Sequence, residues 1–267
     1  MSEENPLFFL FVLVIFISVL GIATFQRNLV WLESSSLWSD AVDKSPGKAR
    51  PHYNYAVTLA DKGDFTAALQ ENLRALDINP LLGKAYFNVG AIYQKRGDVR
   101  RSIDQYRIAI ALRPDLALSH NNLGYAYYTL GRRDEAKREY DEAIRLKPDY
   151  VMAYINRANL QMELNRASGA AADYMSAINF GGNSLGGDVY YRLAMAFKLL
   201  NRPGDAREAR LISIRLEPGL AEGYFELGLM LEREGRSGEA SRLYRQALSL
   251  DPSLENARER LLNIYNK

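Results

Sequence analysis

Residues 117–150 read ALSHNNLGYAYYTLGRRDEAKREYDEAIRLKPDY, and this stretch decides the fold because its pattern returns every 34 residues. Prolines mark the period, and they stand at Pro46, Pro80, Pro114 and Pro148 and again at Pro218 and Pro252. Similar phrases precede them: ALDINP (75–80), AIALRP (109–114), AIRLKP (143–148), ISIRLEP (212–218) and ALSLDP (247–252). A fixed period of this length indicates a repeat array.

A second phrase recurs in the same phase and indicates the kind of repeat. It reads YNYAVTLADKGD (53–64), FNVGAIYQKRGD (87–98), NNLGYAYYTLGR (121–132) and FELGLMLEREGR (225–236). The period and both phrases resemble the tetratricopeptide repeat (TPR), in which each unit is a pair of antiparallel helices. The resemblance implies an all-α superhelical solenoid of stacked helix pairs. Its six units span residues 49–82, 83–116, 117–150, 151–184, 187–220 and 221–254.

Short segments at both ends extend the array by part of a unit. Residues 26–48 carry a juxtamembrane helix in the phase of a second repeat helix, and we expect them to form a half repeat. Residues 255–267 are expected to form a C-terminal capping helix, in which Leu261, Leu262 and Tyr265 cover the open face of the last unit. Repeat arrays need such end caps for solubility.

Small residues recur where two helices must approach closely. The first helices carry Ala56, Gly90, Gly124, Ala158, Ala194 and Gly228, and the second helices carry Ala68, Ser102, Ala136, Ala170, Ala206 and Ala240. Large residues recur three or four positions away, including Tyr106, Tyr140, Tyr174 and Tyr244. Spacings of three and four place these residues on one face of each helix.

Glycine recurs where each first helix should end. Gly63, Gly97, Gly131 and Gly235 occupy this position, and Asn165 and Asn201 replace them in two units. A left-handed residue commonly ends a helix, and asparagine adopts that conformation more readily than other residues with a side chain. We therefore predict positive φ angles at all six positions.

The fourth unit departs from the pattern. Arg157 and Gln161 replace apolar residues, Gly182 stands where proline is expected, and two extra residues fall within GGNSLGG (181–187). Four glycines in seven residues read as a flexible junction. The segment is interpreted either as a looser repeat boundary or as a hinge between units 1–4 and 5–6.

Residues 6–25 read PLFFLFVLVIFISVLGIATF and carry no charge. A helix of this length spans ~30 Å, which matches the hydrocarbon core of a bilayer. The sequence therefore predicts a single transmembrane helix in contact with the lipid bilayer. A cleaved signal peptide is the alternative, with Gly21 and Ala23 before the cleavage site, although MSEEN before the span has no basic residue.

Composition and residue types exclude several kinds of function. The chain has no cysteine, and its net charge of +2 gives no reason to expect a nucleic-acid partner. His52 and His120 share one phase with tyrosines of other units, so they are interpreted as packing residues. No phosphate loop and no pair of nucleophile and base is present. We expect no catalytic residue, no metal and no cofactor.

Binding is better supported, because the first helices of such arrays line a concave side. A row of amides is predicted there, at Asn54, Asn88, Asn122 and Asn156, with aromatic residues nearby at Tyr53, Phe87, Tyr125, Tyr128 and Tyr191. The row resembles the asparagine ladder of the O-linked N-acetylglucosamine transferase, which implies contacts with an extended peptide backbone. Arg192 and Glu226 end the row. The alternative is that asparagine is simply common at this TPR position.

The junction LWSDAVDKSPGKARPHYNYAVTLADKGD (37–64) resembles that of multi-spanning O-mannosyltransferase-like membrane proteins. There the array lies on the luminal or extracytoplasmic side, which implies the same orientation here, whereas Arg27 after the span favours a cytoplasmic array. The predicted function is a membrane-anchored scaffold that binds proteins or extended peptides in its concave groove. The alternatives are a non-catalytic accessory subunit of an envelope glycosyltransferase or other membrane complex, and a cytoplasm-facing adaptor.

Overall fold

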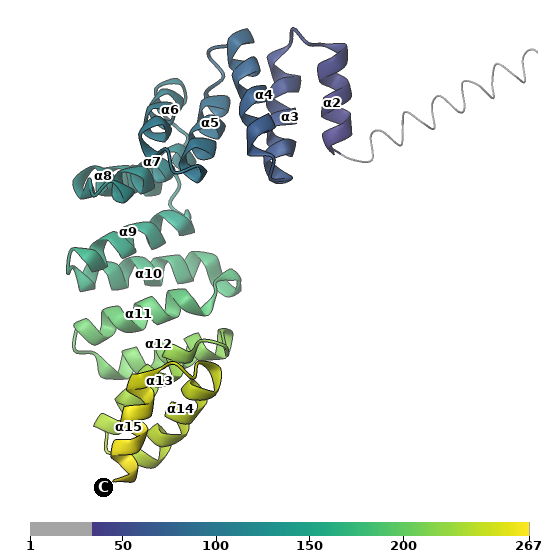
Figure 1. The fold of residues 1–267 in the computed structure, drawn as a ribbon. Coiled ribbons are helices and arrows are strands. Elements are labelled where there is room, and N and C mark those ends of the chain that lie inside the picture. The colour runs from purple at the N-terminus through teal and green to yellow at the C-terminus, as the bar shows by residue number, and fades with distance from the viewer. Residues whose placement is uncertain (1–33, 267) are drawn as a thin grey trace, which may run out of the picture. The chain divides into compact units, whose positions relative to one another are not determined.

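The computed structural model of the chain describes residues 34–266, and every regular element in that range is helical (Figure 1). The helices are α2 (Ser34–Lys44), α3 (Ala49–Asp61), α4 (Phe65–Ile78), α5 (Gly83–Lys95), α6 (Val99–Leu112), α7 (Ala117–Thr129), α8 (Arg133–Leu146), α9 (Val151–Glu163), α10 (Ala167–Gly181), α11 (Gly187–Leu199), α12 (Pro203–Leu216), α13 (Ala221–Arg233), α14 (Ser237–Leu250) and α15 (Glu255–Tyr265). A short 3₁₀ helix, η1 (Gly182–Ser184), follows α10.

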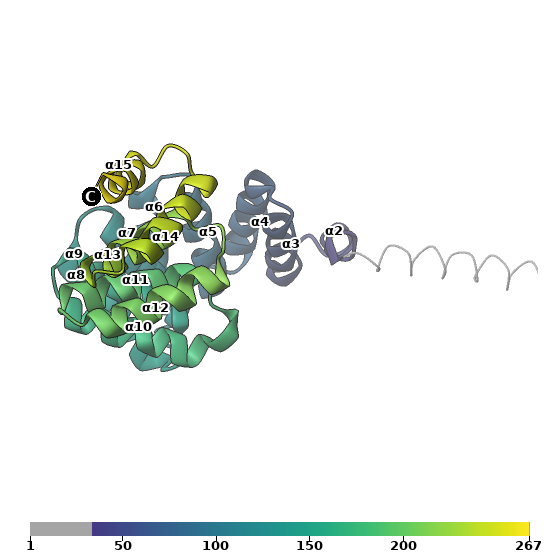
Figure 2. The ribbon, with the colours of Figure 1, turned by 90° about the horizontal axis from the view of Figure 1, so that it is seen from below.

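The helices pack as consecutive pairs, from α3 with α4 to α13 with α14 (Figures 1 and 2). Successive pairs also pack on each other, through α4 and α5 near the N-terminus and through α8 and α9, α10 and α11, and α12 and α13 further along the chain. Each pair falls within one 34-residue period of the sequence. The chain divides into two compact units, one ending at Pro114 and the other beginning at Asp115. The predicted all-α class, with stacked TPR-like helix pairs, is confirmed.

Left-handed residues end the first helices, as predicted. Gly63, Gly97, Gly131 and Gly235 have φ angles between 73° and 84°, and Asn165 and Asn201 have φ angles of 56° and 54°. Because residues with a Cβ atom rarely tolerate this conformation, the chain uses only glycine and asparagine here. At this turn the chain reverses its direction, and the second helix begins.

Close approach explains the small residues of the first helices. A Cβ atom added to Gly90, Gly124 or Gly228 would lie 2.8, 2.7 or 2.5 Å from the ring of a tyrosine on the second helix of the same pair. The tyrosines are Tyr106, Tyr140 and Tyr244, and each is almost completely buried. A larger residue on the first helix would therefore force the pair apart.

Ionic contacts explain the polar residues of the fourth pair. Arg157 on α9 donates to Asp173 on α10, at 2.6 and 2.8 Å, and to Asp141 on α8 at 2.6 Å. Gln161 adds a hydrogen bond of 2.7 Å to the same Asp173 carboxylate. Hydrogen bonds to the two carboxylates raise the pKa of Arg157 and outweigh the effect of burial. The fourth pair thus replaces apolar contacts with a satisfied polar network.

The glycine-rich segment 181–187 is packed, and it lies inside the second compact unit. A Cβ atom at Gly187 would lie 2.4 Å from the backbone oxygen of Ser213 on α12. The Gly187 amide donates to Glu217 at 2.9 Å, and Leu185 packs against the core of α9 to α12. These contacts favour the interpretation as a repeat boundary, and Gly187 permits the close approach of α11 to α12. The hinge interpretation stays a prediction.

The C-terminal helix covers the last pair with a different face from the predicted one. Leu261 and Ile264 pack against the cluster of Leu231, Ala240 and Tyr244. Leu262 and Tyr265 were expected to pack there as well, but they are 56% and 64% exposed. The reason is phase: Leu262 stands 34 residues after Gly228, on the face that a first helix turns toward the second helix of its own pair.

The predicted transmembrane helix, residues 6–25, lies outside the described residues. Within residues 34–266, no helix has both the length and the apolar character that crossing a bilayer requires.

Candidate peptide-binding groove

All nine predicted binding residues lie on first helices of the pairs. Tyr53, Asn54, Phe87 and Asn88 belong to the first compact unit, on α3 and α5, and Asn122, Tyr125, Tyr128, Asn156 and Tyr191 belong to the second, on α7, α9 and α11. Tyr125 is exposed, and the other eight are partly exposed. We call the solvent-facing side of these helices the first-helix face, and we describe it separately for each unit.

In the first unit, the predicted residues contact one another. Asn88 hydrogen bonds to the hydroxyl of Tyr53, which lies on the preceding first helix. Burial raises the pKa of Tyr53, and the Asn88 hydrogen bond partly opposes this effect. The ring of Phe87 lies 5.8 Å from that of Tyr106, so Phe87 also takes part in packing within its own pair.

In the second unit, the amides form a continuous network. Asn156 on α9 donates from Nδ2 to Oδ1 of Asn121 on α7 at 3.0 Å, and Asn121 donates to Oδ1 of Asn122 at 3.2 Å. Asn121 is only 5% exposed. A carboxamide offers two N–H donors and two acceptor lone pairs, so the bond from Asn156 leaves part of its capacity for a ligand.

The residues that end the asparagine row make equivalent bonds. Arg192 reaches Oδ1 of Asn159 on the preceding first helix at 3.5 Å, and Glu226 accepts from Lys198 on the preceding first helix at 2.9 Å. Together with Asn88 and Asn156, these contacts show that this position connects successive repeats. The sequence analysis missed this role because a 34-residue spacing does not reveal which neighbour a side chain reaches.

Tyr128 is held by a carboxylate of the next repeat. Its hydroxyl donates to Glu163 on α9, which also lies 3.4 Å from Nε of Arg133. The hydrogen bond to Glu163 raises the pKa of Tyr128 to about 12, and burial adds to the effect. The ring of Tyr125 lies 6.3 Å away and is 44% exposed. Tyr125 is therefore the more accessible of the two for a ligand.

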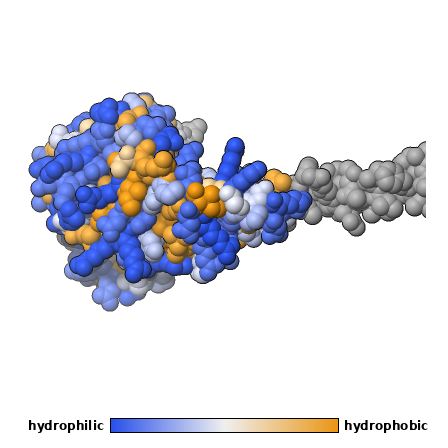
Figure 3. Space-filling model, turned by 90° about the horizontal axis from the view of Figure 1, so that it is seen from above, coloured by the Kyte–Doolittle hydropathy of each residue, from blue (hydrophilic) through white to orange (hydrophobic). Residues whose placement is uncertain are grey.

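Exposed apolar side chains accompany Tyr125 on the first helices of the second unit. Leu118, Met152, Met195 and Leu199 are each more than two fifths exposed. Leu118 and Met152 stand 34 residues apart, at the second residue of α7 and of α9. The sequence analysis missed these four, because leucine and methionine on a helix usually read as core. Hydrophobic patches interrupt the largely hydrophilic surface in the view of Figure 3. The four first-helix residues are candidates for such a binding patch.

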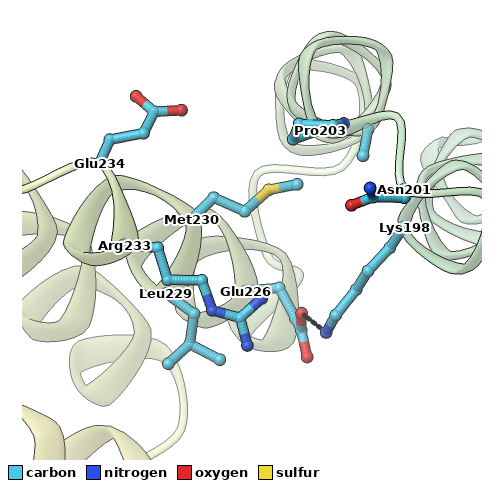
Figure 4. Close-up of a pocket in the computed structure, with 9 residues that line it drawn as sticks. Lys198, Asn201, Pro203, Glu226, Leu229, Met230, Arg233 and Glu234 are labelled. Carbon is cyan, nitrogen blue, oxygen red and sulfur yellow. Dashed lines mark hydrogen bonds and ion pairs between the residues drawn. The ribbon is translucent and has the colours of Figure 1, made fainter.

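A pocket opens where α11, α12 and α13 meet (Figure 4). It is lined by Lys198, Asn201, Pro203, Ala206, Glu226, Leu229, Met230, Arg233 and Glu234. Figure 4 shows the Lys198–Glu226 ion pair, of 2.9 Å, with the guanidinium of Arg233 on the other side of Glu226. Leu229 and Met230 give the pocket an apolar part. The pocket therefore combines charged and apolar groups at the end of the asparagine row.

Tyr191 packs against a buried arginine. The guanidinium carbon of Arg210, on α12, lies 3.8 Å from the centroid of the Tyr191 ring. Arg210 is 2% exposed, and its Nε and Nη1 atoms have no hydrogen-bond partner among the described residues. Burial lowers the pKa of Arg210, and the effects of Tyr191 and Glu226 oppose this shift. One face of Tyr191 is thus occupied within the protein.

The two histidines bond to glutamates of the second helices. Nδ1 of His52 lies 2.6 Å from Glu71, and Nδ1 of His120 lies 2.7 Å from Glu139. His52 is also within 2.9 Å of the Pro46 carbonyl. Within residues 34–266, no cluster of three or more histidine, cysteine, aspartate or glutamate residues could hold a metal ion. Both histidines therefore join the helices of a pair, as the sequence analysis interpreted them.

These helix pairs and their first-helix face define a repeat scaffold, and family comparison agrees. Tetratricopeptide repeat family models match residues 31–82, 117–150 and 221–254, and a related TPR repeat model matches residues 95–131. The matches together cover more than half of the chain, which therefore belongs to the tetratricopeptide repeat family. Proteins of this family are non-catalytic scaffolds, and this chain is not an enzyme.

Several solved structures share the fold. The C-terminal part of a TPR repeat-containing protein from Cytophaga hutchinsonii aligns with a TM-score of 0.68 and 16% identity, over 89% of this chain and 96% of that one. YrrB, described as a TPR protein with an unusual peptide-binding site, aligns with a TM-score of 0.62 and 16% identity, over 70% and 96% of the two chains. At these identities the likeness shows the fold alone.

A chain of the Cut9–Hcn1 hetero-tetramer of the APC/C aligns with a TM-score of 0.65 and 17% identity. The alignment covers 89% of the present chain but only 46% of the Cut9–Hcn1 chain, so the present chain spans less than half of that length. No curated protein matches the chain significantly in sequence. The family model over residues 31–82 covers the junction at residues 37–64 as tetratricopeptide repeat. No comparison bears on the likeness of this junction to O-mannosyltransferase-like proteins, which stays a prediction, as does the accessory-subunit alternative.

Proposed function

We propose that this protein is a membrane-anchored scaffold that binds extended peptide segments of partner proteins on its first-helix face. The observation that carries the proposal is the exposure of Leu118, Tyr125, Met152 and Met195 on successive first helices of the second unit. Exposed apolar and aromatic groups interleaved with amides suit an extended chain, because the amides can bond to its backbone while the apolar groups receive its side chains.

The anchor is the part of the proposal that rests on composition. Residues 6–25 are uncharged and long enough to cross a bilayer as one helix. We place the repeats on the extracytoplasmic side, following the likeness of the junction at residues 37–64. Alkaline carbonate extraction of membranes tests the anchor, since release of the full-length protein would contradict it. Protease protection in intact cells tests the orientation, since a protected array would place the repeats in the cytoplasm.

Peptide binding is tested with two methionines of the fourth repeat. Met152 on α9 is 50% exposed and Met175 on α10 is 45% exposed, so they differ mainly in the face of the pair they occupy. Full-length protein in detergent micelles is used to select binders from a displayed library of random peptides. We expect Met152→Ser to lower the affinity for the selected peptides and Met175→Ser to leave that affinity unchanged. Equal effects of the two substitutions would contradict binding on the first-helix face.

A further inference from the structure

One position of the second helix carries a tyrosine in four repeats. Tyr106, Tyr140, Tyr174 and Tyr244 occupy it, and all four are at most 1% exposed. Arg210 occupies the same position in the fifth repeat. The structure preserves the arrangement, because the Tyr191–Arg210 stack of 3.8 Å takes the place of the Phe225–Tyr244 ring pair of 5.8 Å. In the fifth repeat a guanidinium therefore occupies the position that a tyrosine ring occupies in four other repeats.

Three of the four tyrosines donate their hydroxyl groups to first-helix residues of the same repeat, among them Tyr174, which donates to Asn159 at 2.7 Å. Tyr106 donates to Gln94 at 2.7 Å, and Tyr244 donates to Glu232 at 2.6 Å. In the fifth repeat the residue in phase with Gln94 and Glu232 is Lys198, which has no acceptor to offer. With Lys198 at this first-helix position, the fifth repeat therefore lacks that acceptor, although the guanidinium of Arg210 carries five N–H donors.

Unpaired buried donors of this kind are rare in folded proteins, and each calls for an explanation. Nε and Nη1 of Arg210 are buried and without a partner among the described residues. Glu226 is the carboxylate whose charge acts on Arg210, and it already pairs with Lys198 at 2.9 Å. Glu226 lines the pocket of Figure 4, whereas Arg210 does not, so Glu226 is the pocket residue through which Arg210 is linked to this site.

The charges around this pocket do not cancel. Arg233 lines it, and no ion pair or hydrogen bond joins its guanidinium to another described residue. Glu234 also lines the pocket, but Arg207 and Arg236 hold its carboxylate at 3.0 and 3.4 Å. Lys198 and Arg233 therefore line the pocket with one carboxylate that is not held from outside it, that of Glu226, whose charge also acts on the buried Arg210. The excess of positive charge favours an anion at this place.

We propose that the pocket between the fifth and sixth repeats binds a carboxylate of an extended peptide, held by Lys198 and Arg233 and stabilised from beneath by Arg210. Leu229 and Met230 contact an apolar residue beside that carboxylate. The pocket thereby selects acidic peptides among those that the first-helix face can hold. This inference rests on the proposed peptide-binding function and adds the charge of the peptide to it.

The test uses full-length protein in detergent micelles and a displayed library of random twelve-residue peptides. We expect the selected peptides to be enriched in aspartate and glutamate. For the strongest binder, replacing its acidic residue by glutamine should weaken affinity by about 10- to 150-fold, the range of a charged hydrogen bond. Comparing the free-acid and amidated forms of that peptide distinguishes a side-chain carboxylate from a terminal one.

Two variants link this preference to the pocket. Arg210→Tyr introduces the residue of four other repeats. It should abolish most of the preference for the acidic peptide while leaving the affinity for the glutamine peptide unchanged. Arg233→Gln changes an exposed, unpaired side chain, and it should weaken the acidic peptide alone without shifting the thermal midpoint. Glu226→Gln removes the carboxylate that competes with the peptide for Lys198, and it should raise the affinity for the acidic peptide.

The outcomes separate the two proposals. Selected peptides that show no acidic preference, or a preference that survives both Arg210→Tyr and Arg233→Gln, would overturn this inference and leave peptide binding intact. A library that yields no binder to the wild-type protein would overturn both. An acidic preference that both variants reduce supports both.

Discussion

The fifth and sixth repeats share the same arrangement of paired helices and differ at the buried position that Arg210 occupies in one and Tyr244 in the other. In the sixth, Tyr244 donates to Glu232 at 2.6 Å, so its one polar atom is satisfied. In the fifth, Arg210 occupies the same position with two unpaired nitrogen atoms. Tyrosine satisfies its polar atom at that position, whereas arginine leaves a buried charge that Tyr191 and Glu226 offset only in part. The difference suggests that the fifth repeat gives up stability for binding.

The largest expected effect comes from truncating each of these two side chains. Tyr244→Ala should lower the free energy of unfolding by about 3–5 kcal/mol, as for other buried aromatic residues. Arg210→Ala should cost clearly less, because it also removes two buried nitrogen atoms that have no hydrogen-bond partner among the described residues. Urea unfolding monitored by circular dichroism measures both values. Equal losses would mean that Arg210 contributes to packing as much as Tyr244 does, and the comparison would fail.

Exchanging the arginine for tyrosine should reverse the difference between the repeats. Replacing a buried charge by a well-packed residue of similar volume often raises stability by about 1–4 kcal/mol. We therefore expect Arg210→Tyr to raise the urea midpoint. The matched control is Arg215→Tyr, at an exposed position of the same helix, where little change is expected. A fall in the midpoint of Arg210→Tyr would show that the guanidinium has partners in solution.

The close packing of the two helices within a pair should be alike in the fifth repeat, which carries Arg210, and in the sixth, which carries Tyr244. Ala206 and Ala240, one turn before Arg210 and Tyr244, are both completely buried. Leucine at either position should overpack the pair and cost about 1–3 kcal/mol. Differential scanning calorimetry of the two variants should give similar losses. A much smaller loss for Ala206→Leu would mean that the fifth repeat is loosely packed, and Arg210 would then need no ligand to explain it.

Asn156 allows the bridging role of the asparagine row to be measured. Its bond to the nearly buried Asn121 predicts that Asn156→Ala costs about 0.5–1.5 kcal/mol of stability, the net value of one such bond. Asn54→Ala serves as the comparison, since the described residues hold no first helix before α3 to which Asn54 could bond. Thermal unfolding should resolve a lower midpoint for Asn156→Ala. A midpoint equal to that of the wild type would assign the amide to binding alone.

The smallest effect concerns Tyr128, a tyrosine bonded to a carboxylate of the next repeat. Its folded-state pKa, about 12, lies above the ordinary value of 10. The unfolded chain therefore releases this proton first as pH rises, so the contribution is complete below about pH 10 and is lost toward pH 12. Tyr128→Phe should make the decline of stability over this range less steep. Tyr125→Phe is the control, and the same change in both variants would contradict the Glu163 assignment.

Sequence reasoning predicted the features that depend on one repeat at a time. The ends of the first helices at Gly63 and Asn165 follow from local backbone conformation. The small residue at Gly228 follows from the contact with Tyr244 within the same pair. Prediction from the sequence failed for Leu262 and Tyr265, because apolar character does not indicate which face of α15 packs against the sixth repeat.

The candidate site was less accessible to sequence reasoning. The row of asparagines was identified by its period, but its bonds to the preceding repeat were not. Arg210 was not singled out, although its place in a column of tyrosines was a usable signal. Its significance depends on Lys198 and Glu226, which come from two other helices, and their distances follow only from the folded chain.

The sequence by itself determined the class of protein, the phase of the repeats and the places where helices turn. Each of these depends on interactions between residues close together in the chain, and the 34-residue period repeats them until they are unmistakable. Only the tertiary structure decided which first-helix residues remain exposed and which buried groups lack partners. Those properties depend on contacts between neighbouring repeats, and a hydrogen bond exists only within a few tenths of an ångström of its ideal length.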